Sequence, residues 1–208
     1  MITTVLADFK DRSKQVEKYL LWLSNQESKG GLPDGVLNTA KASALLLIYN
    51  LMESTSSSAI QCIFDSMVTT GVHYDQLSKS LKIITIKNVK SKAAGKIVED
   101  LLSISTDIYK VSFDKDNIFS GNVDALELRN TMKNFGISQN FDYKEPELQN
   151  IKNSRNDLAH GNLSFAEAGK DLTAKEIIGK YWRVRVFFNH MLADYGRFIA
   201  EQRYLSVA

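Results

Sequence analysis

One short stretch of the chain, SRNDLAHGN at 154–162, combines residue types that could act on a phosphodiester. Arg155 can hold phosphate oxygens through paired N–H groups, and it stays charged at every accessible pH. His160 can accept or donate a proton near neutral pH. Asn156, beside the arginine, could position either the phosphate or the imidazole. These types together indicate phosphate binding and proton transfer.

The spacing of this arginine and histidine is not specific by itself. Arg185 and His190 repeat it within the apolar stretch RVRVFFNHM. There we expect a buried or interfacial helix, with His190 as a core or interface histidine. His73 is interpreted as a surface loop residue. Local context must therefore distinguish the two pairs.

The segment EPELQNIKNSRNDLAHG is expected to form a helix, because Pro146 lies in its first turn and Gly161 directly follows its end. At about 100° per residue, Arg155 falls inside an apolar stripe, with Asn156 and His160 together on one flank. The apolar residues of this stripe are Leu148, Ile151, Leu158 and Ala159.

An arginine in an apolar stripe is costly unless it is paired, since it cannot lose its charge. One interpretation is a buried ion pair, with Glu53 as the candidate partner, and His160 as a C-terminal cap of the helix. The other is a cleft lined by Arg155, Asn156 and His160. Helical geometry alone leaves both open.

Long helical segments are expected on both sides of this motif, and they predict an all-α fold. Only two prolines occur, and no repeat or linker suggests a second domain, so we expect a single domain over 1–208. A kink or a break of the helix is possible at 54–58. The segment LKIITIKNV could be a short strand, although helical or irregular structure is favoured there. The expected helices lie around 5–23, at 36–71, over AAGKIVEDLLSISTDIY, over VDALELRNTMKNFGI, and at 173–205.

Composition narrows the class of protein. The chain has 208 residues, 44% of them hydrophobic, and a net charge of +2, which is too small to indicate nucleic acid by itself. A local run of lysines (79, 82, 87, 90, 92 and 96) is most simply a solvated face. Cys62 is alone, so no disulfide or cysteine metal cluster is expected. No signal peptide or membrane span is evident, which predicts a cytoplasmic protein.

The motif and its surroundings resemble the HEPN superfamily, whose signature is an arginine followed by a polar residue and then a histidine. RNDLAHG carries this pattern. The resemblance extends to the MAE_28990/MAE_18760-like (RiboL-PSP-HEPN) branch, and it continues through an apolar last helix. Its other segments are LLLIYNLMESTSSSAI, FSGNVDALELRNTMKNFGI and RNDLAHGNLSFAEAGKDLT.

The resemblance implies an all-α HEPN-type bundle that forms a two-fold homodimer. It also implies a metal-independent endoribonuclease, without cofactor, acting as a toxin or in anti-phage defence. Carried over residue by residue, Arg155 and His160 would be the catalytic pair and Asn156 the polar neighbour, with Glu53 in a supporting role. RNA, a second copy of the chain and an antitoxin or defence protein are the implied partners.

A second interpretation retains the HEPN fold but assigns no catalytic activity to it. In it the chain is a non-catalytic HEPN module, an interaction or RNA-binding subunit of a defence or restriction system. Arg155 and His160 would then hold the dimer together. The near-neutral net charge favours this reading, whereas the intact motif favours the enzyme.

Overall fold

The computed structural model describes residues 1–206 except 91–94, 96, 98–118 and 120–121. Regular structure within the described residues is helical, and their one β contact is an isolated antiparallel bridge between Leu77 and Leu205. The predicted all-α class is confirmed. Apart from positions 95 and 97, the helix expected over AAGKIVEDLLSISTDIY lies outside the described residues. No helix of the described part has the length and apolarity needed to cross a membrane.

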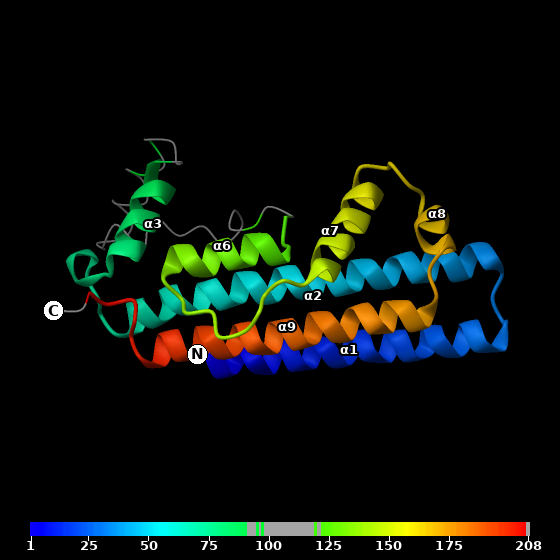
Figure 1. Ribbon diagram of the computed structural model, residues 1–208, viewed down its shortest axis with the longest axis horizontal. Coiled ribbons are helices and arrows are strands. Elements are labelled where there is room, and N and C mark those ends of the chain that lie inside the picture. The colour runs from blue at the N-terminus through cyan, green and yellow to red at the C-terminus, as the bar shows by residue number, and fades with distance from the viewer. Residues whose placement is uncertain (91–94, 96, 98–118, 120–121, 207–208) are drawn as a thin grey trace.

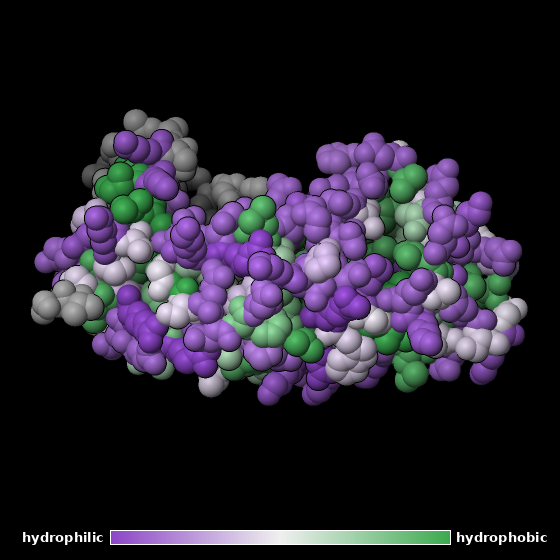
Figure 2. All heavy atoms as spheres, viewed as in Figure 1, coloured by the Kyte–Doolittle hydropathy of each residue, from purple (hydrophilic) through white to green (hydrophobic). Residues whose placement is uncertain are grey.

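Three long helices run side by side and form the body of the molecule (Figure 1). They are α1 (Ile2–Lys29), α2 (Asp34–Thr69) and α9 (Ala174–Ala200), and each packs against the other two. Their apolar stripes meet in one core, in which the rings of Phe9 and Phe188 stack at 6.1 Å. Outside the core, the face shown in Figure 2 is mainly hydrophilic with separate hydrophobic patches.

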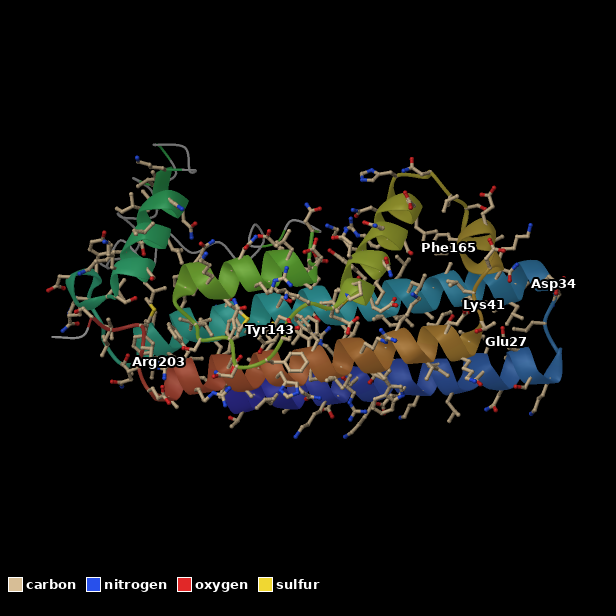
Figure 3. All side chains as sticks on the ribbon, viewed as in Figure 1. Glu27, Asp34, Lys41, Tyr143, Phe165 and Arg203 are labelled. Atoms are coloured by element: carbon tan, nitrogen blue, oxygen red, sulfur yellow. The ribbon has the colours of Figure 1, made fainter. Side chains whose placement is uncertain are left out.

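An ion pair ties the three long helices together at one end of the body (Figure 3). The buried Lys41 of α2 lies 2.8 Å from Glu27 of α1. The second oxygen of Glu27 accepts a hydrogen bond from the backbone N–H of Ala174, the first residue of α9. Burial alone would raise the pKa of Glu27, but these partners outweigh it and lower the pKa.

Helix α2 is continuous from Asp34 to Thr69, so the break considered at 54–58 does not occur. Ser56 is buried, and its hydroxyl donates to the carbonyl of Met52 at 2.7 Å. A serine that bonds back to the preceding turn satisfies its own polar group without breaking the helix. The turn before α2 is made by Gly30, whose φ of 62° is left-handed.

Shorter helices lie along one side of α2 (Figure 1). These are α3 (Lys79–Lys90), α6 (Ala125–Phe135), α7 (Pro146–Ala159) and α8 (Phe165–Lys170), with a 3₁₀ turn at Tyr74–Gln76. The segment LKIITIKNV is therefore helical. Helix α8 was not among the predicted elements, although Ser164 and Glu167 form the capping box that begins it. Gly169 brings α8 against the backbone of Asn38 in α2.

Candidate functional site

Helix α7 carries the motif and rises obliquely from the body, with its C-terminal end projecting outward (Figure 1). Pro146 is in its first turn, and the Glu145 side chain accepts from the N–H of Glu147 at 3.2 Å. The helix ends at its C-cap, His160, and Gly161 then takes a left-handed φ of 71°. The predicted boundaries are thus confirmed, and they place His160 at the outer end of α7.

Two ion pairs fix α7 on its neighbours. Lys152 pairs with Asp124, the N-cap of α6, and Glu147 lies 2.5 Å from Lys180 of α9. Burial alone would raise the pKa of Glu147, but the hydrogen bond and charge of Lys180 outweigh it and lower the pKa. Because the side chains of both pairs are largely buried, the pairs constrain the position of α7 on α6 and α9.

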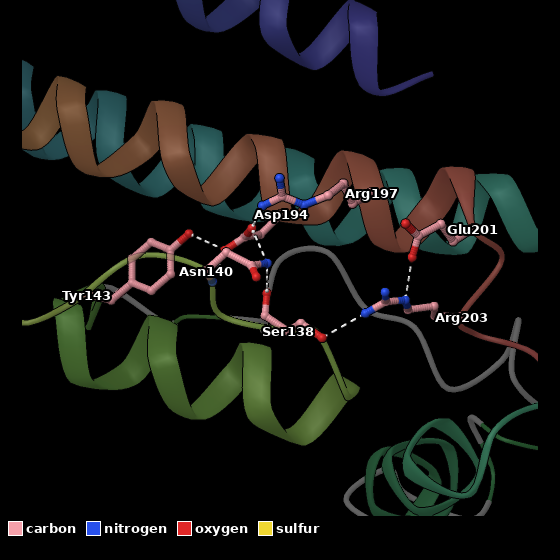
Figure 4. Close-up of polar contacts among 7 residues, drawn as sticks. All are labelled: Ser138, Asn140, Tyr143, Asp194, Arg197, Glu201 and Arg203. Atoms are coloured by element: carbon pink, nitrogen blue, oxygen red, sulfur yellow. Dashed lines mark hydrogen bonds and ion pairs between the residues drawn. The ribbon is translucent and has the colours of Figure 1, made fainter.

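The segment that leads into α7 is held by a buried carboxylate of α9 (Figure 4). Asp194 accepts from the Tyr143 hydroxyl at 2.6 Å, from the backbone N–H of Asn140 at 3.0 Å and from the Asn140 amide at 3.0 Å. Arg197 donates to it as well. This network attaches the connection between α6 and α7 to α9 and so helps to set where α7 begins.

Arg155 lies in the apolar stripe of α7, as predicted, and its partner is an aromatic ring. Leu148, Ile151 and Leu158 are the buried residues of the helix, whereas Ala159, expected in the stripe, is exposed. The Arg155 guanidinium lies 5.2 Å from the centre of the Tyr49 ring in α2, a cation–π distance. The charged end of Arg155 is thus placed on an aromatic ring, which attracts a cation.

The guanidinium of Arg155 is oriented by two uncharged groups. Besides the Tyr49 ring, it donates to the Asn156 side-chain oxygen at 3.0 Å. Asn156 therefore positions the arginine rather than the imidazole. Tyr49 itself is fully buried, and its hydroxyl accepts from the backbone N–H of Val123 at 3.2 Å. The pieces that orient Arg155 come from α2, α7 and the start of α6.

The ion pair considered between Arg155 and Glu53 is not seen. Within the described part of the chain, no carboxylate lies within 4.0 Å of the Arg155 guanidinium. Glu53 is on α2, one turn beyond Tyr49. Burial raises the pKa of Tyr49, and the nearby charge of Glu53 raises it further, whereas Arg155 lowers it. Glu53 thus lies in the same neighbourhood, and its supporting role stays a prediction.

His160 serves as a helix cap through its backbone and keeps its side chain exposed. Its N–H donates to the carbonyl of Asn156 at 2.9 Å. The described residues provide no hydrogen bond or ring contact to the imidazole. The backbone of His160 can therefore cap the helix while its imidazole stays available for proton transfer, because the two roles use different atoms.

The pair with identical spacing on α9 differs in both members. Arg185 is neutralised by Glu17 at 2.6 Å and lies over Trp182 at 4.7 Å. His190 stacks on Phe141, with the ring centres 4.1 Å apart and the planes 5° apart. His190 is exposed, so it does not lie in the core of this chain, and the expected place at an interface stays a prediction. Structure therefore separates two pairs that spacing could not.

Tyr49 is the residue of this site that sequence reasoning missed. It lies within LLLIYNLMESTSSSAI, quoted above for its family resemblance, but nothing in that segment indicates which helix it contacts.

For metals, the described residues contain no group of three or more His, Cys, Asp or Glu side chains placed to hold an ion.

Comparison with known proteins adds a family to this geometry. The family model described as HEPN_MAE_28990/-like HEPN matches residues 1–184, which include α1, α2, α7 and the whole RNDLAHG motif. Searches of curated proteins and of solved structures gave no match. With a helical fold and a family match over most of its length, the chain belongs to the MAE_28990-like HEPN family.

Proposed function

We propose that this protein is a metal-independent endoribonuclease whose active site is formed by Arg155, Asn156 and His160. HEPN domains are generally associated with RNases, although some are non-catalytic. The observation that carries the proposal is the contrast between the two pairs. Arg155 is oriented by an aromatic ring and an amide, neither of which cancels its charge, and His160, at the end of the same helix, is exposed to solvent.

The chemistry uses the nucleophile that RNA itself carries. The 2′-oxygen attacks phosphorus, its proton passes to His160, and the bond from phosphorus to the 5′-oxygen breaks as that oxygen gains a proton. The products are a 2′,3′-cyclic phosphate and a 5′-hydroxyl. Arg155 binds the non-bridging oxygens and stabilises the charge that grows on them. DNA is spared because it has no 2′-hydroxyl.

One histidine in each motif supplies one of the two proton transfers. A homodimer in which two α7 ends face a shared cleft would supply the second from the partner chain. We therefore propose a two-fold homodimer as the active form. Helix α7 projects from the body, so its end is accessible to such a partner (Figure 1).

The test is cleavage of RNA by purified protein in EDTA, with wild type compared with His160→Ala and Arg155→Ala. Loss of a general acid–base group costs about 10²- to 10⁴-fold in rate, which we expect for His160→Ala. Loss of one charge-stabilising donor costs about 10²- to 10³-fold, which we expect for Arg155→Ala. The α9 pair provides matched controls, since His190→Ala and Arg185→Ala make the same chemical changes outside the site. Intact RNA with wild type, or undiminished cleavage by both site variants, would refute the assignment.

The proposed biological role is that of a toxin or anti-phage effector restrained by an antitoxin or another defence protein. Expression of wild type should arrest growth, whereas His160→Ala at equal protein level should not. Equal growth arrest by wild type and His160→Ala would show that toxicity does not depend on cleavage and would contradict the proposed role.

The alternative is a non-catalytic HEPN subunit that binds RNA or protein within a defence or restriction system. The net charge of +2 favours it, since nucleic-acid enzymes with long contacts are usually more basic. In that case wild type and both site variants would leave RNA equally intact, and the variants would alter assembly instead.

A further inference from the structure

Helix α3 is a concentration of positive charge in a nearly neutral protein. Its twelve residues include four lysines and no acidic residue. In the sequence, no Asp or Glu occurs between positions 76 and 98, a stretch that contains six lysines. The whole chain carries a net charge of only +2. The positive charge of this region is therefore local and not a reflection of composition.

The structure places three of these lysines on one solvent-facing side of α3. Lys79, Lys87 and Lys90 are exposed, together with Ile83 and Ile86. These positions recur at helical spacing, so they form one face, which we call the α3 lysine face. Hydrophilic and hydrophobic atoms both face outward on α3 in Figure 2. Within the described part of the chain, none of the three lysines has a hydrogen bond or an ion pair.

Lys82 has a different role from the lysines of this face. Its ammonium group donates to the backbone carbonyl of Asp75 at 2.6 Å, which fixes the turn in front of α3. Lys82 thus has a structural role, which distinguishes it from the lysines of the α3 lysine face.

The opposite side of α3 is occupied by the protein. Leu81 and Thr85 are buried, and Ile84 packs against the core. Helix α3 contacts α6, and α6 contacts α7. Figure 1 shows that helices α3 and α7 rise from the same side of the body. A single strand that crosses this side could contact the α3 lysine face and the end of α7 together.

We propose that the α3 lysine face binds backbone phosphates of RNA and holds the substrate while the α7 site cleaves it. This inference rests on the proposed function. Lysines bind phosphates as point charges and release counterions from the nucleic acid, so the contact is independent of sequence. An anionic membrane is disfavoured, because a surface-bound helix needs a broad apolar face. The large apolar residues that α3 exposes are Ile83 and Ile86, whereas Leu81 is buried and Ile84 packs against the core.

The experiment measures binding of a fluorescent single-stranded RNA by anisotropy at several salt concentrations, in a His160→Ala background that prevents cleavage. The test variant changes Lys79, Lys87 and Lys90 to Gln. The control changes Lys10, Lys14 and Lys18 of α1 to Gln, which removes the same charge from exposed positions of another helix. A third variant changes the α3 lysines to Arg.

We expect the α3 Gln variant to bind RNA at least tenfold more weakly at low salt. Its plot of log K against log salt should be shallower by about 2 units, since each single-strand phosphate contact contributes about 0.7. The control and the α3 Arg variant should match the parent. The readout is binding alone, so it can succeed even if cleavage, and with it the proposed function, fails.

Four results would overturn the inference. They are absence of RNA binding by the parent at low salt, unchanged binding by the α3 Gln variant, equal weakening by both Gln variants, and an effect of the α3 changes seen only on vesicles containing phosphatidylserine. All the substituted lysines are exposed, and matching thermal melts of the variants would show that the fold is retained.

Discussion

Arg155 shows how one residue can be anchored and still keep its charge. Pairing with a carboxylate would anchor it and neutralise it, as Glu17 does for Arg185. The ring of Tyr49 attracts the cation through its π face, and the Asn156 oxygen sets its direction. A guanidinium held in this way remains able to bind an anion. In the proposed site, Tyr49 would therefore position Arg155 without being a catalytic residue itself.

Substitutions at Tyr49 should separate its two contacts. Tyr49→Phe keeps the ring under Arg155 but leaves the buried N–H of Val123 without its acceptor, which should cost about 1–3 kcal/mol of unfolding free energy. Tyr49→Leu also removes the cation–π contact, worth about 0.5–2 kcal/mol. We expect the folded Phe variant to cleave RNA nearly normally and the Leu variant to be about tenfold slower. Urea unfolding and initial cleavage rates measure the two effects.

If the Phe and Leu variants both cleaved RNA as fast as wild type at equal folded fraction, the ring would not position Arg155. An equal loss in both would instead assign the effect to the hydroxyl of Tyr49.

At the residue scale, the sequence predicted which side of α7 carries the arginine but not what lies against it. Helical periodicity identifies a face, because it depends only on neighbours along the chain. The pairing of Arg155 with Tyr49 joins positions over a hundred residues apart, and apolar patterns are similar for every helix of a bundle. For the same reason Glu53 was a reasonable candidate partner, although the ring one turn earlier occupies that place.

At the scale of elements, Asp194 links α9 to the connection between α6 and α7. Burial by itself would raise the pKa of Asp194, but the hydrogen bonds from Tyr143, Asn140 and Arg197 outweigh it, so the pKa is lowered below its ordinary value of 3.8. A lowered pKa means that the folded state favours the ionised carboxylate. Its stabilisation is therefore fully present above the unfolded value and is lost as pH falls through the folded value.

Asp194→Asn should accordingly destabilise the protein by about 2–3 kcal/mol near neutral pH, because buried donors lose a charged acceptor. The difference from wild type should stay constant from about pH 7 to 5 and shrink below about pH 4, as wild type itself becomes protonated. Urea unfolding across this range measures it. Asp8→Asn is the control, since Asp8 is exposed and pairs only with Arg12 among the described residues, and about 0.5 kcal/mol or less is expected. A difference that grew on acidification would contradict the prediction.

Helix α8 depends on the absence of a side chain at Gly169. A Cβ there would lie 1.9 Å from the carbonyl oxygen of Asn38. No rotamer change can relieve this clash, because the backbone sets the position of a Cβ and the oxygen belongs to the backbone of Asn38. Gly169→Ala should therefore cost at least about 1–3 kcal/mol and expose the segment between α7 and α9 to proteases. Gly179→Ala in α9 meets no atom within 4 Å and should stabilise by about 0.5–1 kcal/mol. Equal stability of the two variants would show that α8 does not need this close approach.

At the scale of the whole molecule, the sequence predicted the elements better than their arrangement. Long apolar stripes predicted α1, α2 and α9, and Gly161 marked the end of α7. It did not firmly assign α3, because the short run LKIITIKNV fits two periods. It missed α8, whose six residues are too few to show any period. The assembly of α3, α6, α7 and α8 on one side of α2 depends on contacts such as Gly169 with Asn38, which leave no local pattern.

The last prediction concerns the assembly in which the site works. If each active site takes one His160 from each of two chains, a dimer with a single His160→Ala chain lacks one proton-transfer group. After subunit exchange in an equal mixture, wild-type pairs make up about a quarter of dimers in a two-fold assembly, so cleavage should fall to about a quarter of the wild-type rate. Independent sites would leave about half. The measurement is the cleavage rate as the variant fraction is raised at constant total protein, with His190→Ala chains as the control that should leave the rate unchanged. A linear decline, or a monomeric mass at the assay concentration, would contradict a shared site.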